Sequence, residues 1–394
     1  MAGLTNRWAV LGLVFLIGLT LPMQFQAVPA LAPFLINEAG LSYTDIGVLT
    51  GLFMFPGIFL AAPGGVLATR IGDKAALLMG LAVMLCGALL FAVTDSYAVM
   101  FISRLLSGSG AVMITILLPK VVTDWFVGKE IATALATVAS SFGLGVGLAM
   151  AVLPSLAEMS SWPVAMTLNA SVTVVAMALF FVFFRPHKTP EDTFSRPALL
   201  TLDKPEFVLS VLAGIGRTLF STGYVVFMSF MPLLLISQGM DVVEAGVLTS
   251  LAAVTSMISV PLGGVLSDRT GKPNHFIIGG AVGTTITCLL TPYFAPVLLW
   301  ILLFGILRGG CTGGIMALPS QVLRPESRRA GFAIAAAVYF IGMAAFPAIA
   351  GYVLDATANT AAPLWFAGLL WILIPVLLGA FKILQRKWGI QPQI

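Results

Sequence analysis

The sequence has very little charge for its length. Only 9% of its 394 residues are Asp, Glu, Lys or Arg, whereas 59% are hydrophobic. Soluble domains carry roughly 25% charged residues, so this composition excludes an ordinary soluble domain. Apolar stretches of the roughly 20 residues that are needed to cross a bilayer follow one another along the chain. The composition therefore predicts an all-α polytopic membrane protein.

Residues for metal or redox chemistry are equally scarce. The cysteines Cys86, Cys288 and Cys311 fall in separate apolar runs without ligand spacing, and His187 and His275 lie in or beside predicted loops. We expect no disulfide, no metal site and no cofactor. A membrane enzyme needs a nucleophile, an acid–base pair or a metal cluster near one membrane face, and the sequence shows no such group. We therefore do not expect an enzyme.

Apolar runs between charged or Gly/Pro-rich turns predict twelve transmembrane helices. Their residues are 7–36, 46–69, 75–94, 97–122, 131–153, 163–184, 206–236, 245–267, 275–292, 297–321, 330–353 and 363–384. The first run imitates a secretory signal peptide, but it is too long for one, and we interpret it as an uncleaved span. Four prolines among mixed charges mark a linker after the sixth span. We expect an N-terminal six-helix bundle at 1–184, a cytoplasmic linker at 185–205 and a C-terminal six-helix bundle at 206–394.

The basic residues predict the orientation of these spans. With the N-terminus inside, 17 of the 20 lysines and arginines lie at cytoplasmic helix ends or loops, and the outer loops receive none. The remaining three, Arg104, Arg217 and Arg308, lie within spans. Because cytoplasmic loops are enriched in Lys and Arg, this asymmetry predicts that both termini are cytoplasmic. It also accounts for the basic balance of the chain without a nucleic-acid partner.

The two halves of the chain repeat at an offset of about 199 residues. Residues 45–50 (DIGVLT) match 244–249 (EAGVLT), and 64–67 (GGVL) match 263–266 (GGVL). Helix 4 matches helix 10 at an offset of about 200, where the Leu-Pro pair at 118–119 recurs at 318–319. Two duplicated halves with a site between them at mid-membrane are typical of an alternating-access carrier.

At these positions the chain resembles the major facilitator superfamily over its whole length. The family's loop between helices 2 and 3 reads Gly-x-Leu-x-Asp-Arg-x-Gly-Arg-Lys. The second-half copy, at 264–272, keeps this pattern with Asp268 and Arg269, whereas the first-half copy has Thr69 before Arg70. The resemblance implies two pseudo-symmetric six-helix bundles and a latch at the inner face in which Arg70, Asp268 and Arg269 take part. The Thr69 departure leaves the first-half charge latch in question.

Further motifs refine the resemblance. Arg104, Gly108 and Gly110 are similar to the family's Arg-x-x-x-Gly-x-Gly motif on helix 4, which implies a structural or coupling role. The glycine-rich segment at 143–147 lacks the proline that drug/proton antiporters of the family carry on helix 5. The stretch 120–130 looks most like bacterial carriers grouped with cyanate permeases.

The intramembrane arginines are the strongest functional signal. All 16 acidic residues fall in loops or at helix ends, so no span supplies a carboxylate partner. Each mid-helix arginine costs roughly 2.5–3.5 kcal/mol on insertion scales, and an unpaired buried charge must snorkel or meet an anion. The planar guanidinium fork matches a carboxylate or another small oxyanion. A bracing role against backbone carbonyls is the simpler alternative.

We expect Arg217 and Arg308 to be the charge ligands of a central site. Ser221 and Tyr224 share one helical face with Arg217 at i+4 and i+7, and Thr312 lies at i+4 from Arg308. The other substrate-binding candidates are polar residues of predicted spans: Gln24, Gln26 and Tyr339. For each of these, helix packing is the alternative role.

The first functional hypothesis is a secondary transporter in a bacterial inner membrane that moves a small anion, such as cyanate, a nitrate-like ion or a short carboxylate. The second is an efflux carrier for a neutral or cationic organic compound, which the lack of an intramembrane carboxylate disfavours. The third is a membrane sensor that does not transport. The expected partners are a small-molecule substrate and the lipid bilayer, with no nucleic acid, and the chain is expected to be a monomer.

Overall fold

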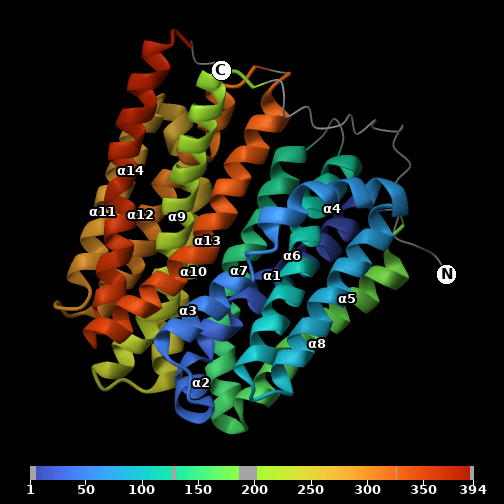
Figure 1. Cartoon of the computed structure of the whole chain (residues 1–394), viewed down its shortest axis with the longest axis vertical. Coiled ribbons are helices and arrows are strands. Elements are labelled where there is room, and N and C mark those ends of the chain that lie inside the picture. The colour runs from blue at the N-terminus through green and yellow to red at the C-terminus, as the bar shows by residue number, and fades with distance from the viewer. Residues whose placement is uncertain (1–5, 127–129, 186–201, 325, 391–394) are drawn as a thin grey trace. The chain divides into compact units, whose positions relative to one another are not determined.

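A computed structural model describes residues 6–126, 130–185, 202–324 and 326–390. Within these ranges the ordered elements are all helices, joined by short turns (Figure 1). The predicted all-α polytopic fold class is confirmed. The chain divides into two compact units, Met1–Phe194 with Asp241–Ser250, and Ser195–Met240 with Leu251–Ile394. The predicted bundle boundaries at 184 and 206 stay a prediction. Residues Asp241–Ser250 belong to the predicted C-terminal bundle, but they group with the first unit.

The first unit is built from eight helices, because two of its predicted spans are each formed by two helices. The elements are α1 (Arg7–Ala30), α2 (Ala32–Ala39), α3 (Tyr43–Leu52), α4 (Gly57–Ile71), α5 (Asp73–Ala92), α6 (Tyr97–Trp125), α7 (Ile131–Met159) and α8 (Trp162–Phe183). α5 packs along α6 and α8, and α1 packs along α7 (Figure 1).

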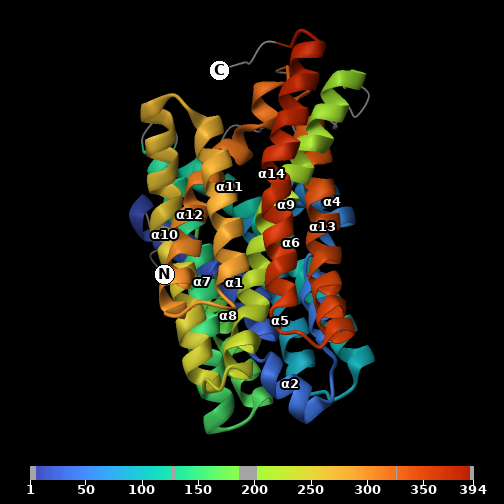
Figure 2. The same ribbon diagram turned by 90° about the vertical axis from the view of Figure 1, so that its left-hand side faces the viewer.

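The second unit contains the remaining elements. They are α9 (Lys204–Ser237), α10 (Val242–Thr270), α11 (Pro273–Leu290), α12 (Val297–Ala317), the 3₁₀ helix η2 (Pro319–Gln321), α13 (Arg328–Thr357) and α14 (Ala362–Lys387). α9 packs against α13 and α14, and α11 lies beside both α12 and α14 (Figure 2). α9 also contacts α12, so it borders the helices that carry Tyr339 and Arg308.

Prolines explain the two interrupted spans. The predicted first span breaks at Leu31, because Pro33 opens α2 and a proline has no backbone N–H for a continuous helix. The second predicted span breaks at the turn before α4, where Pro56 is the N-cap. Both changes alter helix continuity and leave the order of the spans as predicted.

Eleven helical stretches within the described ranges are long and apolar enough to cross a membrane. The predicted span at 275–292 corresponds to α11, an 18-residue helix that begins Pro273-Asn274-His275. These first residues lower its mean hydropathy relative to its neighbours. Its remaining residues are apolar or small, and they pack against α12 and α14.

Candidate substrate site

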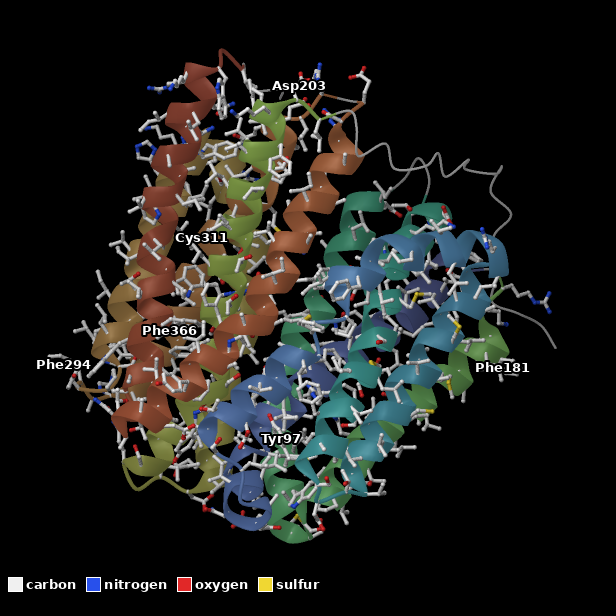
Figure 3. All side chains as sticks on the ribbon, viewed as in Figure 1. Tyr97, Phe181, Asp203, Phe294, Cys311 and Phe366 are labelled. Atoms are coloured by element: carbon white, nitrogen blue, oxygen red, sulfur yellow. The ribbon has the colours of Figure 1, made fainter. Side chains whose placement is uncertain are left out.

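Arg308 lies deep in the second unit. It is eleven residues into α12, about 16 Å along the helix axis. Figure 3 labels Cys311, three residues further on, between Asp203 and Phe294 at opposite ends of the unit. The guanidinium carbon of Arg308 lies 4.0 Å from the ring centroid of Tyr224 and 4.7 Å from that of Phe220. Its Nε is buried and has no hydrogen-bond partner within the described part of the chain.

Arg217 is held in the same manner by a different ring. Its guanidinium carbon lies 4.3 Å from the ring centroid of Tyr339, which α13 supplies. Its Nε is also buried, with no hydrogen-bond partner among the described residues. Ser221, one turn further along α9, lies near Tyr339. The Tyr339 ring thus faces two successive turns of α9.

One face of α9 brings these groups together. Arg217, Phe220, Ser221 and Tyr224 follow at i, i+3, i+4 and i+7, and they therefore lie on one side of the helix. Along one edge of this face, Phe220 and Tyr224 contact Arg308 of α12. Along the other edge, Arg217 and Ser221 face Tyr339 of α13. The structure thus places five of the predicted residues, Arg217, Arg308, Ser221, Tyr224 and Tyr339, around this face.

The positive charges of Arg217 and Arg308 have no carboxylate partner among the described residues. The ion pairs among the described residues join Arg7 to Glu130, Lys120 to Asp73, and Arg324 to Asp203 and Glu206, all at helix ends. None of them involves Arg217 or Arg308. Thr312 makes its hydrogen bond to its own helix, from Oγ1 to the Arg308 carbonyl at 3.4 Å. Stacking on an aromatic face leaves the N–H edge of each guanidinium open to an acceptor.

Gln24 and Gln26 belong to the first unit, where both are about 1% exposed. Gln24 donates from Nε2 to Oγ1 of Thr173 on α8, at 3.5 Å. Gln26 faces α7, where its Nε2 lies 3.5 Å from the sulfur of Met150, and its Oε1 has no partner. The two amides thus face different helices, and their assignment to a common site with the arginines stays a prediction.

Arg104 differs from the other two arginines in its hydrogen bonds. It is 2% exposed, and it donates to the backbone carbonyls of Leu49 (2.9 Å), Gln24 (2.9 Å) and Phe25 (3.1 Å). Its guanidinium carbon also lies 4.6 Å from the Phe53 ring centroid. This arginine braces α1 and α3 from α6. Phe220 and the carbonyls that Arg104 binds were missed by sequence reasoning, because only tertiary packing reveals such partners.

The glycines of the α6 motif allow close helix contact. A Cβ added to Gly108 would meet the carbonyl group of Phe53, and one added to Gly110 would meet the carbonyl oxygen of Gly80. Both positions are therefore closed to larger side chains by backbone atoms. Their predicted coupling role stays a prediction beside this packing role.

The loop motif contributes exposed cations. Arg70 lies in the last turn of α4 and Arg269 in the last turn of α10, and both are exposed. The side chain of Asp268 lies outside the described part of the structure. The predicted latch at the inner face therefore stays a prediction.

Comparison with known proteins agrees with this architecture. The chain matches the Major Facilitator Superfamily at residues 11–216 and 207–387. It is 24% identical to the uncharacterized transporter YycB of Bacillus subtilis over 367 residues, or 91% of this chain and 89% of that protein. It is 23% identical to a hexuronate transporter of the same organism over 279 residues, or 68% of this chain and 66% of that protein. It is also 23% identical to the 2-nitroimidazole transporter of Escherichia coli over 383 residues, or 94% of both chains.

Solved structures show the same fold. A bacterial homologue of the human lysosomal transporter Spinster, in an inward-facing and occupied conformation, superimposes with a TM-score of 0.75 at 17% identity over 100% of both chains. The nucleoside transporter NupG gives a TM-score of 0.73 at 16% identity over 95% of this chain and 99% of its own. From the family match over nearly its whole length and from its membrane-spanning helices, the chain belongs to the major facilitator superfamily and is a multi-pass secondary transporter.

Proposed function

We propose that this transporter carries a small anion by alternating access, with Arg217 and Arg308 as its charge ligands. The observation that carries the proposal is the buried Nε of each arginine, which has no acceptor in the described structure. Arg104, by contrast, donates three hydrogen bonds to backbone carbonyls. A guanidinium charge that no backbone carbonyl accepts a hydrogen bond from needs an anion to offset the cost of its desolvation.

The geometry favours a planar oxyanion. The rings of Tyr224 and Tyr339 lie over the guanidinium groups of Arg308 and Arg217, and in-plane N–H donors stay free for two parallel hydrogen bonds. A carboxylate or a nitrate-like ion has two coplanar oxygens for such a fork. The relative named for hexuronate, the anion of a sugar acid, supports this substrate class. The resemblance of residues 120–130 to carriers grouped with cyanate permeases is part of the same proposal.

We also propose that the protein lies in the inner membrane of a bacterium as a monomer. Both of its termini are then in the cytoplasm. The concentration of Lys and Arg on one side of the predicted spans supports it. Reporter fusions after Pro190 and after Ile394 should both give the cytoplasmic signal. A periplasmic signal from either fusion contradicts the orientation.

A second candidate is export of a neutral aromatic compound. The 2-nitroimidazole transporter of Escherichia coli matches 94% of this chain, and the α9 face offers the rings of Phe220 and Tyr224. On this hypothesis the arginines are structural and the rings bind the substrate. A non-transporting sensor is the third hypothesis, and uptake by proteoliposomes distinguishes it from both.

Arg308→Ala and Arg308→Lys test the anion site. Purified protein is screened by thermal shift against cyanate, nitrate, acetate and longer carboxylates, because a bound anion raises the melting temperature. Arg308→Ala should weaken the best anion by roughly 2–5 kcal/mol, and Arg308→Lys should also weaken it because lysine lacks the fork. The melting temperature without anion should stay equal or rise, because the change removes a half-buried charge that has no ion-pair partner among the described residues.

Arg269→Ala is the matched control, since Arg269 is an exposed arginine at a helix end. It should bind the anion as the wild type does. If Arg308→Ala also binds as the wild type does, whether or not its melting temperature falls, the arginine is a brace and the proposed site is wrong. A shift with neutral aromatic compounds alone supports the second candidate.

A further inference from the structure

An apolar hollow of about 300 Å³ lies between α4, α5 and α6 in the first unit. Its lining includes Leu60, Gly64, Leu67, Met79, Val83 and Met113. The polar residue of its lining, Ser109, donates its hydroxyl to the Leu105 carbonyl of its own helix at 2.8 Å. The hydroxyl hydrogen of Ser109 is therefore already engaged, and the rest of the lining is apolar. Its volume is at the lower end of the range for ligand pockets.

The sequence repeat shows how the two halves differ at this hollow. Gly64 and Gly263 are equivalent positions of the two GGVL segments. A Cβ added to Gly263 would meet the backbone of Gly309, so α10 and α12 touch backbone to backbone. A Cβ added to Gly64 would meet the Met113 sulfur at 3.0 Å and no backbone atom. At this position α4 and α6 meet through a side chain, whereas α10 and α12 meet through their backbones.

A second repeated position gives the same result. Ser259 in the second half donates its hydroxyl to the Gly305 carbonyl at 2.6 Å and ties α10 to α12. Its first-half counterpart is Leu60, a larger side chain that makes no hydrogen bond and is 36% exposed. Leu60 therefore does not tie α4 to α6 as Ser259 ties α10 to α12, and its side chain lines the hollow.

The rim of the hollow lies at membrane depth. Leu67 and Met79 are 36% and 37% exposed, so the hollow is open between α4 and α5. Val83 is ten residues, or about 15 Å, from the start of α5. At that depth in a bilayer the surroundings are hydrocarbon, with no water to fill an open apolar site. A lipid acyl chain has the chemistry of this lining.

One cation at the end of the hollow is available to a lipid headgroup. Arg70 lies one turn beyond Leu67, is exposed, and makes no hydrogen bond or ion pair within the described structure. Neighbouring cations are engaged: Lys74 donates to the Phe181 and Phe184 carbonyls at 2.7 Å each, and Lys120 pairs with Asp73 at 2.8 Å. Arg70 alone of these three is free to meet a phosphate.

We propose that the α4–α5–α6 hollow is a binding site for one anionic phospholipid, whose acyl chain fills the hollow and whose phosphate pairs with Arg70. The site is independent of the anion-transport proposal, because it shares no residue with the α9 face. It makes the first unit the lipid-responsive half of the carrier.

Photoactivatable phosphatidylglycerol with a diazirine in one acyl chain tests the site in nanodiscs. After illumination, mass spectrometry of the full-length protein should place the main cross-link on α4, α5 and α6 peptides that contain Leu67, Met79 or Met113. Val83→Phe fills the hollow and should remove most of this labelling. Arg70→Gln should lower labelling by phosphatidylglycerol about fivefold, as expected for one basic residue near a headgroup with net negative charge. Labelling by phosphatidylcholine should fall less, because its choline offsets the phosphate charge.

Two matched variants serve as controls. Val175→Phe makes the same change at a 53% exposed position of α8, and Arg269→Gln changes the second-half counterpart of Arg70. Both should label as the wild type does. The proposal is overturned by labelling spread evenly over all exposed helices, by labelling unchanged in Val83→Phe, or by equal labelling with the two headgroups. Competition by a transported solute instead assigns the hollow to the solute pathway and also overturns it.

Discussion

Arg104 donates from Nη2 to the carbonyl oxygen of Phe25, 3.1 Å away, and this carbonyl has lost its helical donor because the residue four positions later is Pro29. A proline has no backbone N–H, so the i+4 bond of α1 is missing at this turn. The guanidinium replaces it from α6. This relationship explains why a buried arginine at this site needs no anion.

Arg104→Ala should therefore lower stability rather than ligand affinity. The change removes three charge-assisted hydrogen bonds and leaves the Phe25 carbonyl without a donor. We expect a loss of about 2–4 kcal/mol in the free energy of unfolding. Thermal unfolding without ligand measures it. Arg308→Ala provides the comparison, and equal losses in the two variants contradict the division of roles between them.

Tyr339 should act on the substrate through Arg217. Tyr339→Leu removes the ring that lies 4.3 Å from the guanidinium carbon and keeps an apolar side chain on α13. A cation–π contact contributes about 0.5–2 kcal/mol, so anion affinity should fall about 2- to 30-fold. A double-mutant cycle with Arg217→Gln, which removes the cation, isolates this coupling in the thermal-shift assay. Additive losses from the two changes show that the ring acts separately from Arg217.

Much of the fold followed from patterns that are local in the sequence. Hydropathy located the spans, and Pro33 and Pro56 mark the two breaks because their effect on the backbone is local. The spacing of Arg217, Ser221 and Tyr224 predicted a common helical face for the same reason. The stacking of Arg308 on Phe220 could not be predicted, since it depends on how α9 and α12 meet. Such contacts join residues far apart in the sequence.

Glu206 should be a stability residue at the start of α9. Its side chain is 5% exposed and accepts from Arg324 Nε at 2.9 Å and Ser327 Oγ at 2.8 Å, which ties α9 to the segment before α13. Glu206→Gln removes the charge and keeps the shape, so unfolding free energy should fall by about 1.5–3 kcal/mol. Chemical unfolding in detergent measures it. Glu130→Gln, which breaks the exposed pair with Arg7, should cost less than about 1 kcal/mol. A larger effect at Glu130 reverses the prediction.

Gly108 tests whether its motif acts through packing. A Cβ at this position would meet the Phe53 carbonyl group, which belongs to the turn between α3 and α4 and cannot move aside as a flexible side chain can. Gly108→Ala should therefore push α6 away from this turn and lower the free energy of unfolding by about 1–3 kcal/mol, despite the better helix propensity of alanine. Gly12→Ala on α1 is the matched control, because nothing lies within 4 Å of a Cβ there. It should be neutral or stabilise by about 0.5–1 kcal/mol. Thermal unfolding of both variants without ligand, followed by transport in proteoliposomes, separates the two roles. If Gly108→Ala keeps wild-type stability and loses transport, Gly108 acts in coupling, and close packing is not the reason for a glycine at this position.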